Sequence, residues 1–252
     1  MKLVICEKPS VAKAVASALG VTSRADGCFE GNGLIVSWCV GHLVSPMDAA
    51  GYDLGYKKWK YDDLPILPEP FRYVLAKGKE DAFQNLKHLM EREDVTELVN
   101  ACDAGREGEL IFRLVYEMAG CAKPFSRLWI SSMEDAAIRE GFNDLRPGAE
   151  YDPLYQSALC RQKADWLIGI NATRLFSVLY HRTLNVGRVQ TPTLAMLVDR
   201  DWKITSFKKE KYHHVRLALD GAEAVSEKIS ASEEAESLRA ACADGPAVCT
   251  SV

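Results

Sequence analysis

The stretch TELVNACDAGREGELIFRLVYEMAG, residues 96–120, changes character twice along its length. Its first seven residues form an apolar run typical of a buried strand, and beyond Glu107 apolar residues recur at helical spacing. Three carboxylates, those of Asp103, Glu107 and Glu109, stand between the two segments together with Arg106. A strand that passes through a short loop into a helix is the repeating unit of a parallel α/β sheet.

Strands and helices alternate on both sides of this stretch. Residues 2–6 predict a strand, followed by a helix that Ser10 caps and Gly20 ends. Further segments are predicted as a hairpin at 28–40, an irregular excursion at 44–80, a helix at 81–90 and a strand at 126–131. We therefore expect an α/β domain over residues 1–147, with a Rossmann-like, mostly parallel sheet covered by helices on both faces.

The chain changes character after LRPGAEYDP, residues 145–153. Residues 148–211 predict a mainly helical portion, with one long helix or a broken pair over residues 152–182. A further helix is expected from Thr191, with Leu194, Leu197 and Val198 facing inward. Residues 212–252 predict a small α+β piece that contains a helix near 231–243 and a strand in AVCTSV, residues 247–252.

Composition is that of a globular protein, with 48% hydrophobic and 26% charged residues among 252. No apolar run is long enough to span a bilayer or to form a signal-peptide core, so we expect a cytoplasmic protein without membrane contact. The eight cysteines include no CxxC pair. Cys6, Cys39 and Cys102 stand in apolar strand-like runs, which favours buried reduced thiols over a zinc site.

Charge is unevenly distributed along the chain, whose net charge is −4. Residues 160–213 carry ten Lys and Arg against four Asp and Glu, whereas residues 220–252 carry two against seven. A basic middle segment beside an acidic end permits a local site for a polyanion. Solvated surface charge is the alternative explanation.

Acidic residues follow two of the predicted strands. Glu7 ends the strand at 2–6, and Asp103 ends the strand at 96–102. Ligands of open α/β sheets bind beyond the carboxyl ends of the strands. If the two strands are neighbours, Glu7, Asp103 and Glu107 converge as ligands for Mg²⁺, and Lys8 and Arg106 face a phosphate.

Glu7 in such a cluster could also hold a proton for general acid–base chemistry, because neighbouring carboxylates raise one another's pKa. The alternative is purely structural. Glu107 and Glu109 at a helix start interact favourably with the helix dipole, and Arg106 can simply pair with a carboxylate.

A second group of candidates lies in RQKADWLIGINATRLFSVLYHR, residues 161–182. Arg161, Arg174 and His181 offer positive charge for phosphates, and Trp166 offers an aromatic platform for bases, which is typical of single-strand binding. The alternative is that Trp166 packs in the core.

The segment LNVGRVQTP, residues 184–192, forms a third group. Gly187 allows close approach of the backbone to a ligand, and Arg188 and Gln190 can donate to phosphates or base edges. An ordinary turn before a helix is the alternative. His42, which follows a predicted strand, is a weaker candidate, because a lone histidine is more often packed and hydrogen-bonded.

Two motifs together resemble a known family. CEKPSVAKAVA, residues 6–16, and ACDAGREGELI, residues 101–111, resemble the TOPRIM domain of type IA DNA topoisomerases of the topoisomerase III branch. The segments SWCVGHL, KKWKYDDLPILPE, RQKADWLIGINATR and LNVGRVQTPTLAMLVDRD follow in the order that this family shows. The resemblance covers residues 1 to about 219.

The resemblance implies an ATP-independent isomerase. Such an enzyme cleaves one DNA strand by attack of a tyrosine, holds a 5′-phosphotyrosine, passes another strand and reseals the break with help from Mg²⁺. It implies that residues 148–211 are part of a DNA-groove domain and that residues 212–252 begin a gate domain. Single-stranded DNA is the implied partner of a nucleoid-associated protein, which we expect to be a monomer.

Most of the roles carried over from the family fall on residues already singled out. Glu7, Lys8 and Arg106 are implied to be catalytic, and Glu7, Asp103 and Glu107 to be metal ligands. The implied DNA contacts are Trp59, Arg161, Trp166, Arg174, His181, Asn185, Val186, Gly187, Arg188, Val189 and Gln190.

The chain departs from the family pattern at Gly105, where the family usually has a second aspartate. We therefore expect weaker binding of Mg²⁺, or binding of a single ion, with Glu107 or Glu109 compensating. Asn185 stands where the family often has serine. The tyrosine that precedes Arg-Thr in the family has no counterpart here, so we expect the N-terminal part of a longer enzyme, inactive by itself.

Two other functions remain open at this point. One is a different TOPRIM phosphotransferase, such as a primase or nuclease, which residues 155–201 do not favour. The other is a non-catalytic module for single-stranded DNA, which would not need Glu7 and Asp103.

Overall fold

The computed structural model describes residues 1–243 and 248. Contacts divide the chain into two compact units, residues 1–192 and 193–252, and each is described by itself. The domain boundaries predicted at residues 147 and 211 remain predictions. Of the strand predicted at 247–252, all residues but Val248 lie outside the described part of the chain.

A seven-stranded sheet forms the centre of the first unit, in the order β2-β3-β4-β1-β7-β8-β9. The four strands from β4 to β8 are parallel, whereas β2, β3 and β9 pair antiparallel at the edges. The strands are β1 (Lys2–Cys6), β2 (Ser23–Ala25), β3 (Cys28–Gly31), β4 (Leu34–Trp38), β7 (Glu97–Ala101), β8 (Phe125–Arg127) and β9 (Arg146–Pro147). The predicted α/β class and the predicted hairpin, here β3 and β4, are confirmed.

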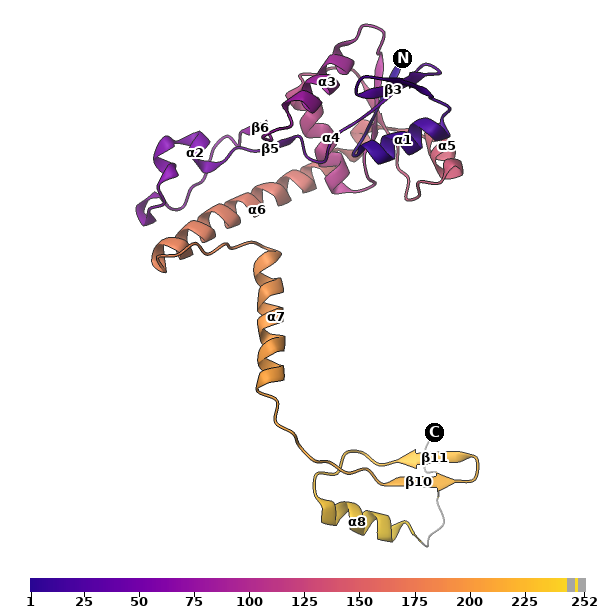
Figure 1. Cartoon of the computed structure of the whole chain (residues 1–252), viewed down its shortest axis with the longest axis vertical. Helices are drawn as coiled ribbons and strands as arrows, with labels where there is room; N and C mark the ends of the chain where they lie inside the picture. Colours follow the sequence, from indigo (N-terminus) through magenta and orange to yellow (C-terminus); the bar gives the residue numbers. More distant parts are fainter. Residues whose placement is uncertain (244–247, 249–252) are drawn as a thin grey trace. The chain divides into compact units, whose positions relative to one another are not determined.

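Helices cover both faces of this sheet (Figure 1). They are α1 (Pro9–Ala18), α3 (Glu80–Glu91), α4 (Arg106–Met118) and α5 (Asp135–Asn143). Helices α3 and α4 bury their apolar residues in the core on one face, and α1 and α5 bury theirs on the other. The helices that follow β1 and β7 therefore lie on opposite faces.

Strand β1 shows why the sheet needs both covers. Leu3 and Ile5 point into one core and Val4 and Cys6 into the other, all fully buried. Burying each such side chain contributes about 1.5–3 kcal/mol, so a strand of this composition is stable only between two layers.

The cysteines predicted to be buried and reduced, Cys6, Cys39 and Cys102, are buried free thiols. Burial raises the pKa of the Cys6 thiol well above its usual range, which keeps that thiol protonated and unreactive.

The start of α1 corrects one expectation. The helix begins at Pro9, with Lys8 at the N-cap, so Ser10 lies inside the first turn and is not the cap. Proline is favoured at this position because it has no N–H to leave unsatisfied. Gly20, with φ of +69°, follows the end of the helix as predicted.

The excursion at residues 44–80 is more ordered than predicted. It contains a two-stranded sheet and short helical turns: β5 (Val44–Pro46), α2 (Ala49–Tyr52), η1 (Leu54–Lys57), η2 (Tyr61–Asp63) and β6 (Tyr73–Leu75). The excursion lies along α6 (Asp152–Leu179). This is a single helix over most of residues 152–182, where one long helix or a broken pair was expected. Asn171 of α6 clamps the excursion, because its side chain accepts from the N–H of Ile66 and donates to the Ile66 carbonyl.

The small α+β piece predicted after residue 212 is confirmed in the described part of the second unit. An antiparallel pair, β10 (Arg216–Leu219) and β11 (Ala222–Val225), precedes α8 (Ser232–Ala241). Helix α7 (Gln190–Thr205) corrects an expectation, because Leu194, Leu197 and Val198 are 59%, 63% and 60% exposed rather than inward. An apolar stripe predicts that a helix has a covering partner but not which segment provides it.

No helix in the described residues is long and apolar enough to cross a membrane.

Gly108 in the first turn of α4 generates a prediction about the fold. A Cβ at this position would lie 2.2 Å from the carbonyl oxygen of Asp103, so Gly108→Ala forces strand end and helix apart. We expect a loss of about 1–3 kcal/mol in unfolding free energy, as for other overpacked sites, measured by urea denaturation. Gly105→Ala is the control, because no described atom lies within 4 Å of its Cβ; an equal loss in both variants would contradict this account.

Candidate active site

The carboxyl ends of β1 and β7 meet at one edge of the sheet. Cys6 pairs with Ala101 in the parallel register, so Glu7 and Asp103 leave neighbouring strands almost side by side. The chain continues into α1 on one face and into α4 on the other. This reversal makes the edge a topological switch point, where open α/β sheets bind their ligands.

Glu7, Lys8 and Asp103 share this edge. The Nζ of Lys8 lies 3.1 Å from Oε1 of Glu7, whose side chain is mostly buried. A hydrogen bond to Glu7, the charge of Glu7 and the charge of Asp103, in that order, raise the pKa of Lys8. The strand register brings Glu7 and Asp103 to the same edge of the sheet, and their joint role as metal ligands remains a prediction.

Two helices begin at the same edge without a side-chain oxygen at the N-cap. Lys8 at the cap of α1 has only donors, and Gly105 at the cap of α4 has no side chain. Their first-turn N–H groups and the positive ends of both dipoles favour an anion. Arg106, the first residue of α4, adds an exposed guanidinium, only loosely paired with Glu107 at 3.9 Å.

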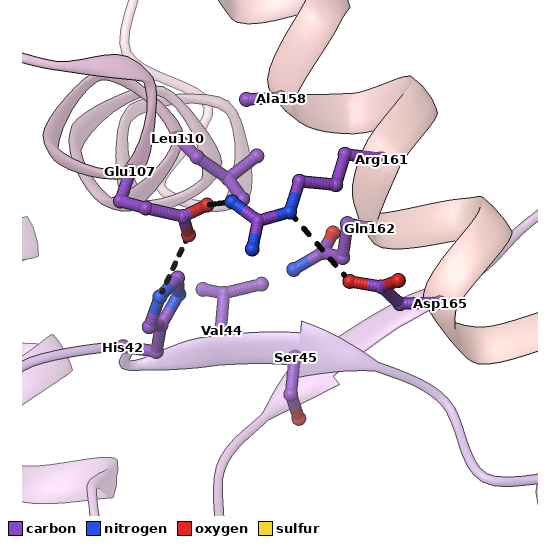
Figure 2. Close-up of a pocket in the computed structure, with 9 residues that line it drawn as sticks. All are labelled: His42, Val44, Ser45, Glu107, Leu110, Ala158, Arg161, Gln162 and Asp165. Atoms are coloured by element: carbon purple, nitrogen blue, oxygen red, sulfur yellow. Dashed lines mark hydrogen bonds and ion pairs between the residues drawn. The ribbon is translucent and has the colours of Figure 1, made fainter. Parts of the chain in front are cut away.

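The Glu107 side chain contacts residues other than Glu7 and Asp103, with which it was predicted to converge. Its carboxylate accepts a hydrogen bond of 2.9 Å from Arg161 of α6 and lies 3.8 Å from Nε2 of His42 (Figure 2). Among residues 1–243 and 248, no group of three or more His, Cys, Asp or Glu is arranged to hold a metal ion. The predicted trio of Glu7, Asp103 and Glu107 is thus not assembled, because Glu107 pairs with an arginine on the helix that packs against α4.

Glu109 is an ion-pair centre in the core and cannot compensate for Gly105. Its carboxylate is fully buried and accepts hydrogen bonds from Asn100 and Arg113, at 3.0 and 2.9 Å. The Nε atom of Arg127 lies 3.1 Å from Oε2 of the same Glu109 carboxylate. The expectation that Glu109 supports a metal is corrected, since a carboxylate enclosed by two guanidinium groups has no free face.

Sequence reasoning missed this buried centre. The i,i+4 spacing of Glu109 and Arg113 indicates an ion pair, but a surface pair has the same spacing. Only the burial of the apolar neighbours of Glu109 distinguishes the two cases, and it depends on the tertiary packing of α4.

A cavity of about 320 Å³ opens beside Glu107, between the start of β5 and α6. Figure 2 shows His42, Glu107, Arg161 and Asp165 around it. Asp165, which the sequence analysis missed, lies 3.7 Å from Arg161 and 2.5 Å from Arg188. Charges that alternate from Glu107 to Arg188 thus connect the acidic edge to the loop at 185–190. His42, a weak candidate from sequence, belongs to this cavity.

Two of the predicted DNA contacts have packing roles in the structure. Arg174 is buried, donates 2.9 Å to the Tyr56 carbonyl and lies 5.5 Å from the ring centre of Trp59. Trp166 donates to the Met47 carbonyl and packs edge-on against Tyr52 and Phe71. Both side chains hold the excursion on α6, so the packing alternative is favoured for Trp166, and Arg174 has a packing role that was not predicted.

His181 and Trp59 lie together at the far end of α6. His181 follows the helix, which ends at Leu179, and its φ is +52°, so His181 does not continue the helix that carries Arg174. Trp59, His181 and Arg182 line an open hollow there. Trp59 is 41% exposed and retains one free face.

The loop at 185–190 is anchored to the end of α6. Val186 donates its N–H to the hydroxyl of Thr173, and Gly187 donates to the hydroxyl of Thr191. Asn185, Arg188, Val189 and Gln190 are exposed along it. The loop therefore presents its side chains from a fixed backbone, as a binding loop requires.

The donor set at the switch point fits Mg²⁺. Glu7 and Asp103 offer hard carboxylate oxygens, and Mg²⁺ is usually held by only one or two carboxylates, keeping waters and taking phosphate oxygens for the rest. Glu7 and Asp103 are the residues that would hold it, next to the anion-attracting helix starts.

The fold and these motifs place the chain in a family. A model of the Toprim domain matches residues 2–133, more than half of the chain, and one described as DNA topoisomerase matches residues 149–252. The chain belongs to the Toprim family. Its sequence is homologous to the N-terminal part of type IA topoisomerase III, which confirms the resemblance seen in the sequence.

Named relatives support this assignment. The chain is 46% identical over 219 residues to "DNA topoisomerase 3" of Bacillus subtilis (strain 168), covering 87% of this chain and 30% of that protein. Identity is also 46% over 214 residues to "DNA topoisomerase 3" of Shouchella clausii, covering 85% and 29%. The chain spans about 30% of the length of these curated relatives.

A solved structure shares the fold. Full-length topoisomerase I from Thermotoga maritima superimposes with a TM-score of 0.63 at 24% identity, covering 94% of this chain and 37% of that one.

Gly105 generates a prediction about the metal. Its φ of 172° is ordinary extended backbone, and no described atom lies within 4 Å of a Cβ there, so Gly105→Asp introduces a carboxylate without strain. We expect tighter Mg²⁺ binding, measured by calorimetric titration, because a further oxygen ligand joins Glu7 and Asp103. Gly105→Asn is the uncharged control; an unchanged affinity in Gly105→Asp would refute the expectation.

The Asp165–Arg188 pair generates a prediction about pH. A hydrogen bond from Arg188 is the main cause that holds the pKa of Asp165 below its usual value. The ionised Asp165 carboxylate therefore stabilises the folded state above about pH 4, and this stabilisation is lost as pH falls through the folded-state pKa of Asp165.

Arg188→Gln should raise the pKa of Asp165 toward 3.8, measured by carboxyl ¹³C NMR titration. Arg182→Gln, at an exposed arginine beyond the C-terminal end of α6, is the control. A pKa that is the same in Arg188→Gln and in the wild type would show that the pair does not form in solution.

Proposed function

We propose that this chain forms the phosphate-handling part of a topoisomerase that cleaves and reseals single DNA strands through a tyrosine outside this sequence. The observation that carries the proposal is the convergence of Glu7, Lys8 and Asp103 with two helix starts at the switch point. Carboxylates next to an anion-attracting site fit a metal-assisted reaction of a phosphodiester better than simple DNA binding.

Each residue at this edge has a distinct proposed role. Lys8 and Arg106 bind the phosphate and balance its charge, while Glu7 holds or releases a proton at its carboxylate. Glu7 and Asp103 would hold Mg²⁺, which would supply additional positive charge at the phosphate. Arg106 is suited to this role because its guanidinium is exposed and only loosely paired.

The DNA strand is proposed to run from the acidic edge along the cavity to the loop at 185–190. Arg161 and Arg188 lie on this path, where Arg161 pairs with Glu107 and Arg188 pairs with Asp165. A phosphate can compete for both guanidinium groups, because exposed ion pairs contribute only about 0–1 kcal/mol. Asn185, Gly187 and Gln190 are the further proposed contacts in the loop.

The whole reaction, the absence of an ATP requirement and the action as a nucleoid-associated monomer belong to this proposal. We propose that the 252-residue chain alone does not relax supercoiled DNA. A primase or nuclease is disfavoured by the match of residues 149–252 to the DNA topoisomerase model. A non-catalytic DNA-binding module has no use for Glu7 and Asp103.

Binding of a fluorescent single-stranded oligonucleotide, measured by anisotropy with and without Mg²⁺, tests the proposal. We expect Mg²⁺ to tighten binding by the wild-type chain and to have no effect on Glu7→Gln or Asp103→Asn, which lack a metal ligand. Glu93→Gln, a surface acid elsewhere in the fold, is the control and should respond like the wild type. Binding that is indifferent to Mg²⁺ and to Glu7→Gln would instead support the non-catalytic module.

A further inference from the structure

Arg127 is a fully buried arginine directly behind the acidic edge. It is the last residue of β8, the strand next to β7, and its relative exposure is 0%. A guanidinium cannot lose its charge at neutral pH, so enclosing it is costly unless its donors are used. Burial lowers the pKa of Arg127, and the charge of Glu109 opposes that shift.

The terminal nitrogens of Arg127 donate hydrogen bonds to backbone carbonyls at the end of β7. Nη1 donates to the carbonyl oxygens of Asn100 and Cys102, at 3.0 and 2.7 Å, and Nη2 donates to that of Asp103 at 2.6 Å. Nη1 also reaches the Leu128 carbonyl at 3.0 Å. One side chain therefore holds the backbone of the two residues that carry the chain from β7 into the acidic loop.

Glu109 ties the same guanidinium to α4. Its Oε2 lies 3.1 Å from Nε of Arg127, which makes an ion pair. Within the described part of the chain, this Nε atom has no hydrogen-bond partner. Oε1 of Glu109 accepts from Arg113, which in turn pairs with Asp152. The strand end is thus linked through Arg127 and Glu109 to the helix whose N-terminus faces the phosphate site.

Helix α4 packs against Asp103 from the opposite side, because Gly108 has no side chain to keep the helix away. A Cβ there would lie within 2.2 Å of the Asp103 carbonyl oxygen, so α4 lies directly against this peptide. The backbone of Asp103 is confined between Arg127 and α4, although its side chain is exposed.

We propose that Arg127 is a positioning residue for the acidic edge, which fixes the direction in which Asp103 presents its carboxylate by holding the Cys102 and Asp103 carbonyls. The inference rests on the proposed function, because it concerns the same metal and phosphate site. Arg127 touches neither the phosphate nor the metal, and it acts through Asp103.

Arginine is required at this position because the contacts spread over a planar fork. A lysine ammonium keeps the charge but is a single point, and it cannot reach the Asn100, Cys102 and Asp103 carbonyls with the same geometry. Arg127→Lys should therefore preserve the electrostatic balance with Glu109 and lose the alignment of Asp103.

Arg113 provides a matched control. It forms the other buried ion pair of Glu109, but its hydrogen bonds go to Glu109 and to the Gly148 carbonyl and not to the β7 end. Arg113→Lys should lower stability in the same way as Arg127→Lys, because each disturbs one pair of the same carboxylate.

The test measures Mn²⁺ binding to the 252-residue chain by electron paramagnetic resonance, together with thermal unfolding and metal-free binding of single-stranded DNA. We expect Arg127→Lys to weaken Mn²⁺ binding about 10-fold, as is usual when a group that orients a metal ligand is changed. Arg113→Lys should keep wild-type Mn²⁺ affinity, and both variants should keep metal-free DNA binding, since Arg161 and Arg188 are unchanged.

A second variant keeps the inference testable if Arg127→Lys does not fold. Glu109→Gln/Arg127→Gln removes both charges together and leaves Arg113 its partner Asp152, so no buried charge is stranded. It should show the same loss of Mn²⁺ affinity.

Equal Mn²⁺ affinity in Arg127→Lys and Arg113→Lys would overturn the positioning role and leave Arg127 as a structural residue. Failure of the proposed function has a different signature, namely a wild-type chain whose Mn²⁺ binding is absent or indifferent to Glu7→Gln. That outcome would overturn both proposals.

Discussion

The parallel register of β1 with β7 determines where this protein can do chemistry. Because Cys6 pairs with Ala101, the chain leaves both strands at the same level and delivers Glu7, Lys8 and Asp103 to one edge. The two helices that follow lie on opposite faces and begin with N-caps that offer no oxygen. Negative side chains and positive helix ends therefore meet at one edge of the sheet, a combination suited to a cation and a phosphate together.

Burial gives the acids of ACDAGREGEL three different environments. Asp103 is exposed at the edge of the sheet, Glu107 points to Arg161 on α6, and Glu109 is enclosed in the core. A buried carboxylate must be paired, and Arg127 and Arg113 provide the pairing. The charges of this stretch thus lie in two places, at the exposed edge of the sheet and in the buried ion pairs that join β7 to α4.

Much of the fold could be predicted from local patterns. Strand β1, the β3–β4 hairpin and helix α3 carry strong periodicity, and each was located within a few residues. The excursion at 44–80 could not be predicted as ordered, because its structure depends on distant contacts such as those of Asn171 with Ile66. Helix α7 shows the opposite limit, since its apolar stripe is clear in sequence but exposed here.

Only the part of the candidate site that lies directly after predicted strands could be predicted from the sequence. Glu7 and Asp103 follow apolar runs, so their convergence follows from the topology of a parallel sheet. The orientation of Glu107, the burial of Glu109 and the packing of Trp166 depend on which helix lies opposite, and residue type alone does not specify that. Arg127 was not singled out because an arginine after a strand has no distinguishing pattern until its burial is known.

Paramagnetic relaxation by Mn²⁺ in NMR spectra of the wild-type chain tests the central claim most directly. If Glu7 and Asp103 hold the ion, amide signals of Lys8 and Gly105 should broaden at lower Mn²⁺ than those of Gly33 and Thr96 at the opposite ends of the strands, and Glu7→Gln should restore the affected signals. Broadening that is equal across the chain, or centred on the acidic residues of α8, would contradict a metal site at the carboxyl ends of β1 and β7.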